Sequence, residues 1–550
     1  SNSVFGEDSQ AGNGGNGGGG TGGTARLVAN GGTISSNGET IDITANGVSG
    51  EAGLAGTGQG GGANGANGGF SGTTGGRVVI ETAGGVSGPG QIDLGLTNIT
   101  ANGDIAGRIE LRSGGNITFA GLDARALGFA APTNNDTDEA LSGIFIAPTG
   151  GTIASQGDVN LTTDGSVGIY AQANGIFDVD GILTIATGDQ IDIRHEFREG
   201  AAPTIRASDS LIATAVTSIS ATPGGLLGAG DMLSLTASGP TGTISVDRLA
   251  GNDITLSSTG ATSVEHAEAV NDFTATAGNF RTGLNSIITG GDISITSPGA
   301  VDLGNSTAGG FVQVQGQSIA FNSITAGLSV GLSADGTTAG AEGINGGSIA
   351  AGEDINLFAN SIALTGNVTG NASFFAFGTG GAVSVNDADV DGTISIFSAA
   401  DLTGTYVAGG DIFLNSDANI NASAQANGGY IDRNGNATQG NLFVIAAGNA
   451  ALTDSSAGRM FGVNAGVAAS IDGGTAGEDI LVLAGTTANL TDVTGDDDIT
   501  VRAVGNIDAL NVRTTGAGAD THILDFSTAS GSPTFTISVG EGTQGTNGAD

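Results

Sequence analysis

The sequence predicts an all-β fold, a right-handed parallel β-helix (β-solenoid) with turns of about 19–20 residues and glycine-rich loop insertions near the N-terminus. Three observations lead to this prediction. A short phrase recurs at that spacing, apolar and other residues alternate within each phrase, and long helical patterns are missing. The residues 263–273 are the nearest helical candidate, and they are too short to support a helix.

The recurring phrase consists of Gly, one or two of Asp, Asn or Thr, and then an apolar-x-apolar core, as in "GGDISITS", "GEDINLFA" and "GGDIFLNS". Alternation indicates a β-strand, because successive side chains point to opposite faces. The first inward residues of successive phrases follow one another at a nearly constant spacing with one longer step, and they are Ile254, Phe273, Ile293, Val312, Val330, Ile355, Phe375, Ile394 and Ile412. The repeat is too short for a propeller blade or a helical repeat, and it fits a β-helix turn of three strands, roughly 25 to 28 turns in all if most of the chain coils.

A second phrase opens the chain. "ARLVANGG", "GRVVIETAGG" and "GRIELRSGG" predict strands that begin at Arg26, Arg77 and Arg108. The glycine-rich runs at 11–24 and 53–76 precede the first two strands, so we expect loops or edge strands there. The sequence therefore predicts three parts: a glycine-rich start of the β-helix (1–105), a regular β-helix (106–525), and a last strand with a polar tail (526–550).

Glycine accounts for 103 of the 550 residues and tryptophan is absent, which suits a narrow interior filled by small side chains. One patch is rich in phenylalanine. We expect its members to stack in the core of neighbouring turns rather than to form a cofactor slot. They are Phe358, Phe374, Phe375, Phe377, Phe397 and Phe413.

Charge and composition exclude several functions. The net charge is −40 and the 14 basic residues are all arginine, so a nucleic-acid partner, which needs clustered basic residues, is not expected. Cysteine is absent, which excludes disulfides and thiolate chemistry. No apolar run is long enough to cross a bilayer, so no membrane-spanning helix is expected. The chain begins Ser1-Asn2-Ser3, and we expect it to be a processed product or an internal piece of a larger protein.

Catalytic motifs are weak. The G-x-G-x-x-G at Gly12, Gly14 and Gly17 leads into a strand, whereas a dinucleotide site needs a preceding strand and a following helix. In "IDIRHEFREG", His195 and Glu196 would be an acid/base or metal-binding pair in a functional interpretation. No further ligand follows at the spacing of a known metal motif, so the sequence does not support this interpretation. Alternation puts four charged residues on one strand face, and we expect an exposed, charge-paired face there. These four are Asp192, Arg194, Glu196 and Arg198. We therefore predict no enzyme; a glycan-cleaving enzyme on this fold is the alternative of another class.

Three aspartates each precede the first core residue of successive turns: Asp253, Asp272 and Asp292. Two charges stacked ~4.8 Å apart repel by about 1 kcal/mol in water, so either the side chains splay into solvent or a hard cation bridges them. Carboxylate oxygens suit Ca²⁺. These residues are the candidate Ca²⁺ ligands, and no other cofactor is expected.

The G-x-D-I-x-[LIV] phrase at this period resembles the filamentous-haemagglutinin-like exoproteins, β-helical adhesins that bacteria export largely by two-partner secretion. The resemblance implies an extracellular, cell-surface stalk whose partners are host or neighbouring-cell surfaces, glycans, or copies of itself. The alternative within this class is a subunit of a self-assembling extracellular filament or surface layer, because open β-helix ends expose strand edges.

Overall fold

The protein was described from a computed structural model. The described residues are 22–47, 74–85, 88–104, 106–128, 143–171, 175–195, 204–221, 225–283, 287–335, 343–431, 437–516, 522–525 and 535–538. The chain divides by its contacts into a first unit, Ser1–Val270, and a second unit, Asn271–Asp550. The glycine-rich runs fall mostly outside the described residues.

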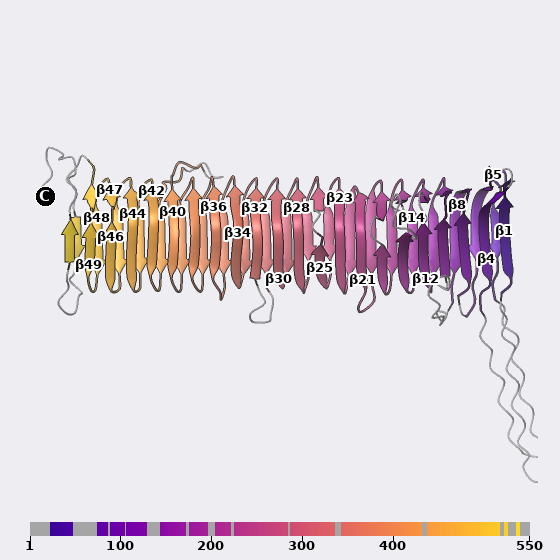
Figure 1. The fold of residues 1–550 in the computed structure, drawn as a ribbon, viewed down its shortest axis with the longest axis horizontal. Coiled ribbons are helices and arrows are strands. Elements are labelled where there is room, and N and C mark those ends of the chain that lie inside the picture. The colour runs from indigo at the N-terminus through magenta and orange to yellow at the C-terminus, as the bar shows by residue number, and fades with distance from the viewer. Residues whose placement is uncertain are drawn as a thin grey trace, which may run out of the picture. The chain divides into compact units, whose positions relative to one another are not determined.

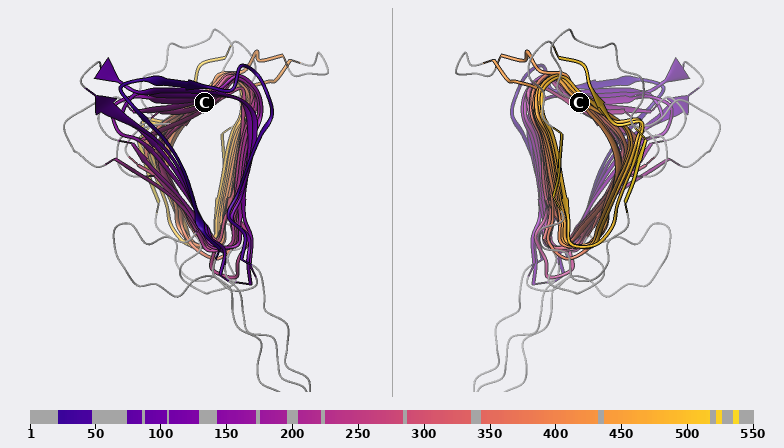
Figure 2. Two further views of the ribbon diagram at one scale, coloured as in Figure 1. Left: turned by 90° about the vertical axis from the view of Figure 1, so that its right-hand side faces the viewer. Right: turned by 90° about the vertical axis from the view of Figure 1, so that its left-hand side faces the viewer.

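Each unit is a parallel β-solenoid, and its turns are built from three strand positions, as Figures 1 and 2 show within each unit. Strands at one position pair in parallel with the same position of the next turn. We call the three stacks ladders A, B and C, where ladder A contains the strands of the recurring phrase. The described residues contain no helix. The predicted all-β parallel solenoid is therefore confirmed.

In the first unit, ladder A consists of β3 (Ile41–Thr44), the second halves of β6 (Gln91–Thr100) and β8 (Asn116–Ala126), β11 (Val159–Thr163), β14 (Leu183–Thr187), β17 (Leu211–Ala215), β20 (Met232–Ala237) and β22 (Asp253–Ser258). Ladder B consists of β1 (Thr24–Asn30), β4 (Arg77–Gly85), β7 (Arg108–Ser113), β9 (Gly143–Pro148), β12 (Ser166–Ala171), β15 (Gln190–His195), β18 (Ser218–Ala221) and the first halves of β21 (Thr243–Gly251) and β23 (Ala261–Ala269). Ladder C consists of β2 (Thr33–Ser35), the first halves of β6 and β8, β10 (Thr152–Ser155), β13 (Ile176–Val179), β16 (Thr204–Ala207), β19 (Leu226–Ala229) and the second halves of β21 and β23. The short β5 (Gly88–Pro89) pairs antiparallel with β4.

In the second unit, ladder A consists of β24 (Phe273–Thr276), β27 (Ile293–Thr296), β29 (Val312–Gly316), β31 (Val330–Ala334), β33 (Ile355–Ala359), β35 (Phe374–Gly378), β37 (Ile394–Ser398), β39 (Ile412–Ser416), β41 (Leu442–Ala446), β43 (Phe461–Ala465), β45 (Ile480–Ala484), β48 (Ile499–Ala503) and β51 (His522–Asp525). Ladder B begins with β25 (Asn279–Thr282) and ladder C with β26 (Ile287–Thr289). Both then run through β28 (Ala300–Ala308), β30 (Ser318–Ala326), β32 (Gly343–Ala351), β34 (Ser361–Gly370), β36 (Val383–Val390), β38 (Leu402–Ala408), β40 (Ile420–Ala426), β42 (Ala450–Ala457) and β44 (Ala468–Ala476). Ladder B ends with β46 (Thr487–Thr491), β49 (Ile507–Leu510) and β52 (Phe535–Ser538), and ladder C with β47 (Thr494–Gly495) and β50 (Arg513–Thr514).

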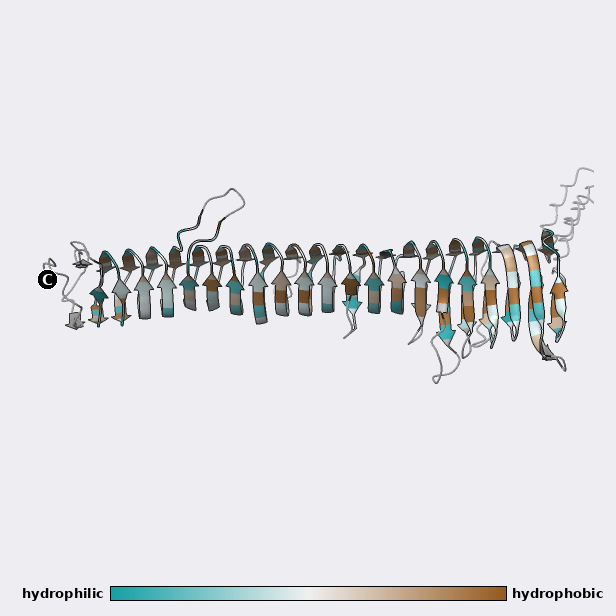
Figure 3. Cartoon of the chain, turned by 90° about the horizontal axis from the view of Figure 1, so that it is seen from above, coloured by the Kyte–Doolittle hydropathy of each residue, from teal (hydrophilic) through white to brown (hydrophobic). Residues whose placement is uncertain are grey.

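Side chains alternate between the interior of the coil and its outside, and brown and teal bands alternate accordingly along strands of the first unit in Figure 3. In ladder A of the second unit, for example, Val312 and Val330 are directly paired and fully buried. Burying one such side chain stabilises a protein by about 1.5–3 kcal/mol. The stacked interior is thus the main source of stability, and it repeats from turn to turn.

Eight of the nine predicted inward residues are buried, and one prediction is wrong. Phe374, not Phe375, is paired with Ile355 and with Ile394, so Phe374 and Ala376 point inward while Phe375 points outward. A shift of one residue exchanges the two faces of a strand, and the Phe-Phe pair fits either choice.

Two smaller predictions also need correction. Among the described residues, ladder B has nine strands in the first unit and thirteen in the second, fewer than the predicted 25 to 28 turns. Some turns are longer than 20 residues, since Leu122 pairs with Val159, 37 residues further along the chain. Strands β4 and β7 begin at Arg77 and Arg108, as predicted, but β1 begins at Thr24, two residues before Arg26, so that Arg26 pairs with Val79 rather than with Arg77. The helical candidate 263–273 lies mainly in β23. The part boundaries at 105 and 525 remain predictions.

Candidate interaction surface

The predicted calcium ligands Asp272 and Asp292 accept backbone hydrogen bonds across turns. Asp272 Oδ1 accepts from the N–H of Asp292 at 2.8 Å, and Asp292 Oδ1 accepts from the N–H of Phe311 at 2.8 Å. Asp253 is the first residue of β22 in the first unit. Among the described residues, no group of three or more acidic, histidine or cysteine side chains could hold a metal ion. Calcium at these aspartates remains a prediction.

The same hydrogen bond recurs in front of other ladder A strands. Asp354 Oδ1 accepts from the N–H of Ser373 at 3.1 Å, and Asp411 Oδ1 accepts from the N–H of Asn441 at 2.7 Å. Each bond gives a backbone N–H donor a partner where the chain turns into a strand. The Asp or Asn in the recurring phrase therefore has a structural role at this corner.

The charged stretch "IDIRHEFREG" is described only in part. Asp192 and Arg194 lie on one strand face, as predicted, and Arg194 Nε lies 2.6 Å from Asp192 Oδ2. The Asp192 side chain is buried rather than exposed, with the Tyr170 hydroxyl donating to it at 3.3 Å. Burial raises the pKa of Asp192, and the nearby Arg194 and Tyr170 only partly offset this effect. Glu196 and Arg198, and the side chain of His195, lie outside the described residues.

A second charged cluster, missed at the sequence level, surrounds Glu110 in ladder B of the first unit. Glu110 points away from the core residues Ile109 and Leu111, yet it is fully buried beneath arginine side chains. Arg77 donates to both of its carboxylate oxygens, at 2.6 and 2.8 Å, and the Nε atoms of Arg108 and Arg112 lie 2.8 and 3.0 Å away.

Phe145 of the neighbouring turn covers this cluster. Its ring centroid lies 5.7 Å from the guanidinium of Arg108 and 5.2 Å from that of Arg112. Burial alone would raise the pKa of Glu110, but the hydrogen bond from Arg77 and the charges of the three arginines outweigh it and lower the pKa. The cluster is internally paired, which favours a structural role.

The phenylalanine-rich patch stacks across neighbouring turns, as predicted, but most of it does not lie in the core. Only Phe374 is in the core; the other five predicted members point outward from ladder A of the second unit, because they occupy the alternate positions of their strands. Phe443 follows on β41, also facing outward. We call these six outward residues the phenylalanine array: Phe358, Phe375, Phe377, Phe397, Phe413 and Phe443.

Rings of the array contact one another across turns. Phe375 lies 5.3 Å from Phe358 and 5.9 Å from Phe397, measured between ring centroids. Phe397 also lies 6.0 Å from Phe377 and 5.4 Å from Phe413. These separations are typical of favourable aromatic pairs. Phe397 is therefore the hub of the array, and stacking between rings holds the outward side chains in place.

The array remains partly exposed despite this stacking. Phe358 is 45% exposed, and Phe377 and Phe443 are 38% and 37% exposed. Ile445, next to Phe443 on β41, extends the apolar surface, and Leu481 on β45 is a further exposed apolar residue of the same face. Exposed apolar residues are ordinary when they occur singly, but a contiguous group marks an interaction site.

This face also carries no charge over most of its length. The eleven strands from β24 to β45 place two residues each on the outside of ladder A, and none of these 22 residues is Asp, Glu, Lys, Arg or His. The chain as a whole has a net charge of −40. Ladders B and C of this unit do carry outward charges, for example Asp302 and Asp387. The uncharged surface is thus specific to ladder A.

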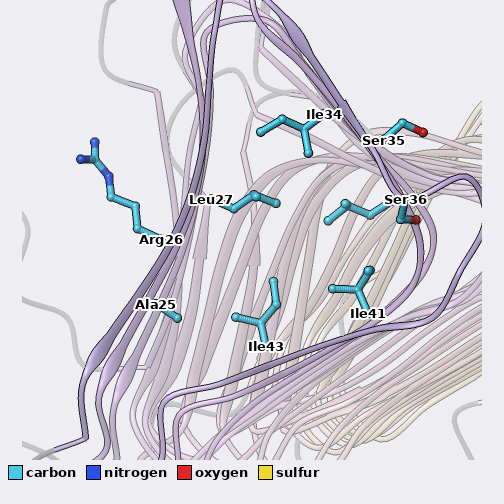
Figure 4. Close-up of a pocket in the computed structure, with 9 residues that line it drawn as sticks. Ala25, Arg26, Leu27, Ile34, Ser35, Ser36, Ile41 and Ile43 are labelled. Carbon is cyan, nitrogen blue, oxygen red and sulfur yellow. The ribbon is translucent and has the colours of Figure 1, made fainter.

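The first turn of the first unit forms a second apolar feature. Leu27, Ile34, Ile41 and Ile43 point into an opening at the end of the described coil, as Figure 4 shows. All four side chains are only half-buried. Among the described residues, β1, β2 and β3 each pair with a later turn on one side only. This end of the described coil therefore presents both strand edges and an accessible apolar interior.

The fold and these surfaces define a class: a parallel β-solenoid protein with an uncharged, partly aromatic face. In comparisons with protein-family models, curated proteins and solved structures, nothing matches the chain. No helix in the described part of the chain is long and apolar enough to cross a membrane.

Proposed function

We propose that this chain is a non-catalytic structural and adhesive β-solenoid of an extracellular bacterial exoprotein, and that the outside of ladder A in the second unit is its contact surface. The phenylalanine array supports this proposal. Exposed aromatic side chains on the outside of a rigid ladder contribute nothing to the coil interior, whereas they suit contact with another surface.

Rigidity of the scaffold adds to this argument. Each ring stands on a strand that is hydrogen-bonded to both neighbouring turns, and the inward residues beside it are buried. The array is thus held before a partner arrives, so contact does not require ordering of a flexible loop. Such a surface favours adhesion rather than catalysis. The charged clusters around Asp192 and Glu110 form ion pairs within themselves.

Adhesion can be tested with the purified chain on a quartz-crystal microbalance carrying either hydrocarbon-terminated or hydroxyl-terminated films. We expect retention on the hydrocarbon film, and about a tenfold loss in a Phe358→Ser, Phe377→Ser, Phe397→Ser variant. A Gln313→Ser, Gln315→Ser variant is the matched control, because these residues face outward from the same ladder away from the array. Equal retention of the array variant and the control would refute the proposed contact surface.

The strand edges and half-buried apolar residues of the first described turn favour a second candidate, a subunit of a self-assembling filament. Strand edges and an accessible interior at one end of a solenoid are suited to pairing with the end of another coil. Electron microscopy of the purified chain over a range of concentrations tests this idea. Polymers that disappear in an Ile43→Glu variant, but persist in a Thr44→Ser variant, would support end-to-end assembly; their absence in the unaltered chain would rule it out.

A further inference from the structure

We propose that the partner of the phenylalanine array is a second copy of this chain, packed face to face through ladder A of the second unit about a twofold axis at β37. This inference rests on the proposed function only for the identity of the contact surface. It adds a partner and a geometry, and both can be tested separately from adhesion.

The regularity of ladder A suits packing of one sheet on another. From β24 to β48, each strand pairs with the next without a shift in register. By contrast, ladders B and C share strands whose register shifts where they bend, as between Gly346 and Ile349 or between Val385 and Ala388. Two sheets pack closely when their faces are regular, with strands within about 30° of each other.

The distribution of charge favours a like partner over a charged one. A partner selected by charge would meet no complementary side chain among the 22 outward residues from β24 to β45. Two copies of a chain with net charge −40 repel each other, and this repulsion is smallest when uncharged faces meet. Ladder A of the second unit is such a face.

The chemistry of the array disfavours a glycan. The four strands from β35 to β41 place eight residues outward, and only Ser395 and Asn415 among them are polar. A sugar polymer needs hydrogen-bonding groups between the rings to satisfy its hydroxyls. The phenyl rings of an identical face can pack between the rings of the array, and this packing needs no hydrogen-bonding groups.

The array is also suited to twofold symmetry. Its six residues lie on five successive ladder A strands, and β37, which carries the hub Phe397, is the middle one. A twofold axis at β37 places β35 of one copy over β39 of the other, and β33 over β41. Every strand with an outward phenylalanine then faces another, as an isologous interface requires.

The available area matches a stable dimer. The nine strands from β29 to β45 lie symmetrically about β37, and at ~4.8 Å per strand and ~16 Å of strand length they cover roughly 700 Å². Two copies would bury about 1,400 Å² in total, within the range of specific protein interfaces.

Engineered cysteines test the geometry directly, because the chain has none of its own. Ser395 faces outward on β37, so in the proposed dimer the Ser395→Cys side chains of two copies lie close together. We expect this variant of the full chain to form a disulfide-linked dimer at least tenfold faster than Thr274→Cys, which faces outward on β24, away from the axis. Equal rates would overturn the proposed axis.

Sedimentation velocity of the full chain gives the second measurement. We expect a dimer at micromolar concentration, and a dissociation constant at least tenfold larger for Phe397→Ser but not for Thr274→Ser, which faces outward on β24, outside the nine strands of the proposed interface. A monomer at 100 µM would overturn the dimer. Retention on the hydrocarbon film by such a monomer would leave the contact surface intact, so the two proposals fail separately; a dimer unaffected by Phe397→Ser would also contradict the inference.

Discussion

Ladder A has the same inside and a different outside in the two units. In the first unit, its outward residues from β11 to β22 are mostly Thr, Ser and Asn, with no aromatic residue. In the second unit, the corresponding positions from β33 to β41 carry the phenylalanine array. Inward residues in both units are mostly small or branched apolar side chains, such as Ile254 and Ile293, although the second unit also buries a few phenylalanines there, such as Phe374.

This difference separates what builds the solenoid from what the solenoid displays. Inward positions must fill a coil of constant width, so the choice of residues there is narrow. Outward positions meet solvent or a partner, and the fold accepts threonine or phenylalanine alike. Function on such a scaffold therefore resides in the outward residues. Substitutions of outward residues should change binding, whereas substitutions of inward residues should change stability.

The largest expected effect contrasts two neighbouring residues on β35. Phe374 is fully buried, so Phe374→Ala should destabilise the second unit by about 3–5 kcal/mol. Phe375 lies outside, and Phe375→Ala should cost less than about 1.5 kcal/mol through lost ring contacts. Chemical denaturation of both variants measures the difference. Similar losses would mean that inside and outside are not distinct on this strand.

The next largest effect concerns the outside of the first unit, where ladder B carries charge. Glu110→Gln removes the carboxylate that the three arginines share, and should destabilise the first unit by about 3 kcal/mol at neutral pH. Thermal unfolding would show this loss, and Glu81→Gln, whose carboxylate forms a more exposed pair with Arg26, is the control.

The pH dependence of this variant has a defined sign. Folding lowers the pKa of Glu110 from its ordinary value of 4.5, so the ionised carboxylate stabilises the folded state. That contribution is complete above about pH 4.5 and is lost as the pH falls through the lower folded-state pKa. Stability of the unaltered chain should therefore decline faster than that of Glu110→Gln below this range. Parallel declines would contradict the assignment.

Periodicity made the fold predictable, because a nearly constant spacing of short alternating strands leaves few alternatives to a solenoid. The inward set could be identified wherever the phrase contains one apolar series, as at Ile293 and Ile412. The choice of the inward residue failed at Phe374 and Phe375, because both alternating series of this strand are apolar. Only the pairing with neighbouring turns decides which of the two residues points inward. Alignment of each phrase with the preceding one would have placed Phe374 beside Ile355. The Glu110 cluster could not be predicted, since its arginines come from two strands that are distant in sequence.

A smaller effect tests a corner that repeats in the second unit. Asp454, Gly473, Asp492 and Asn511 have φ values of 45°, 76°, 52° and 55° and are equally spaced along the chain. This left-handed conformation is tolerated by Gly, Asn and Asp and disfavoured for β-branched residues. Gly473→Val should destabilise the second unit by about 1–2 kcal/mol in denaturant unfolding, whereas Gly473→Asn should have little effect. An equal effect of both substitutions would contradict a conformational cause.

The smallest expected effect on stability comes from making the second unit resemble the first. Phe397→Thr places on β37 the residue type that faces outward on β20 and β22. Because Phe397 contacts three other rings but lies outside the core, the free energy of unfolding should change by only about 0.5–1.5 kcal/mol. Association should change much more, since the hub of the array is lost. The converse variant, Thr236→Phe, should leave the first unit folded without creating association, because one ring without neighbours forms no contiguous patch. A Phe397→Thr variant that unfolds would show that the array belongs to the fold, and the distinction between an inside that builds and an outside that binds would not hold for the second unit.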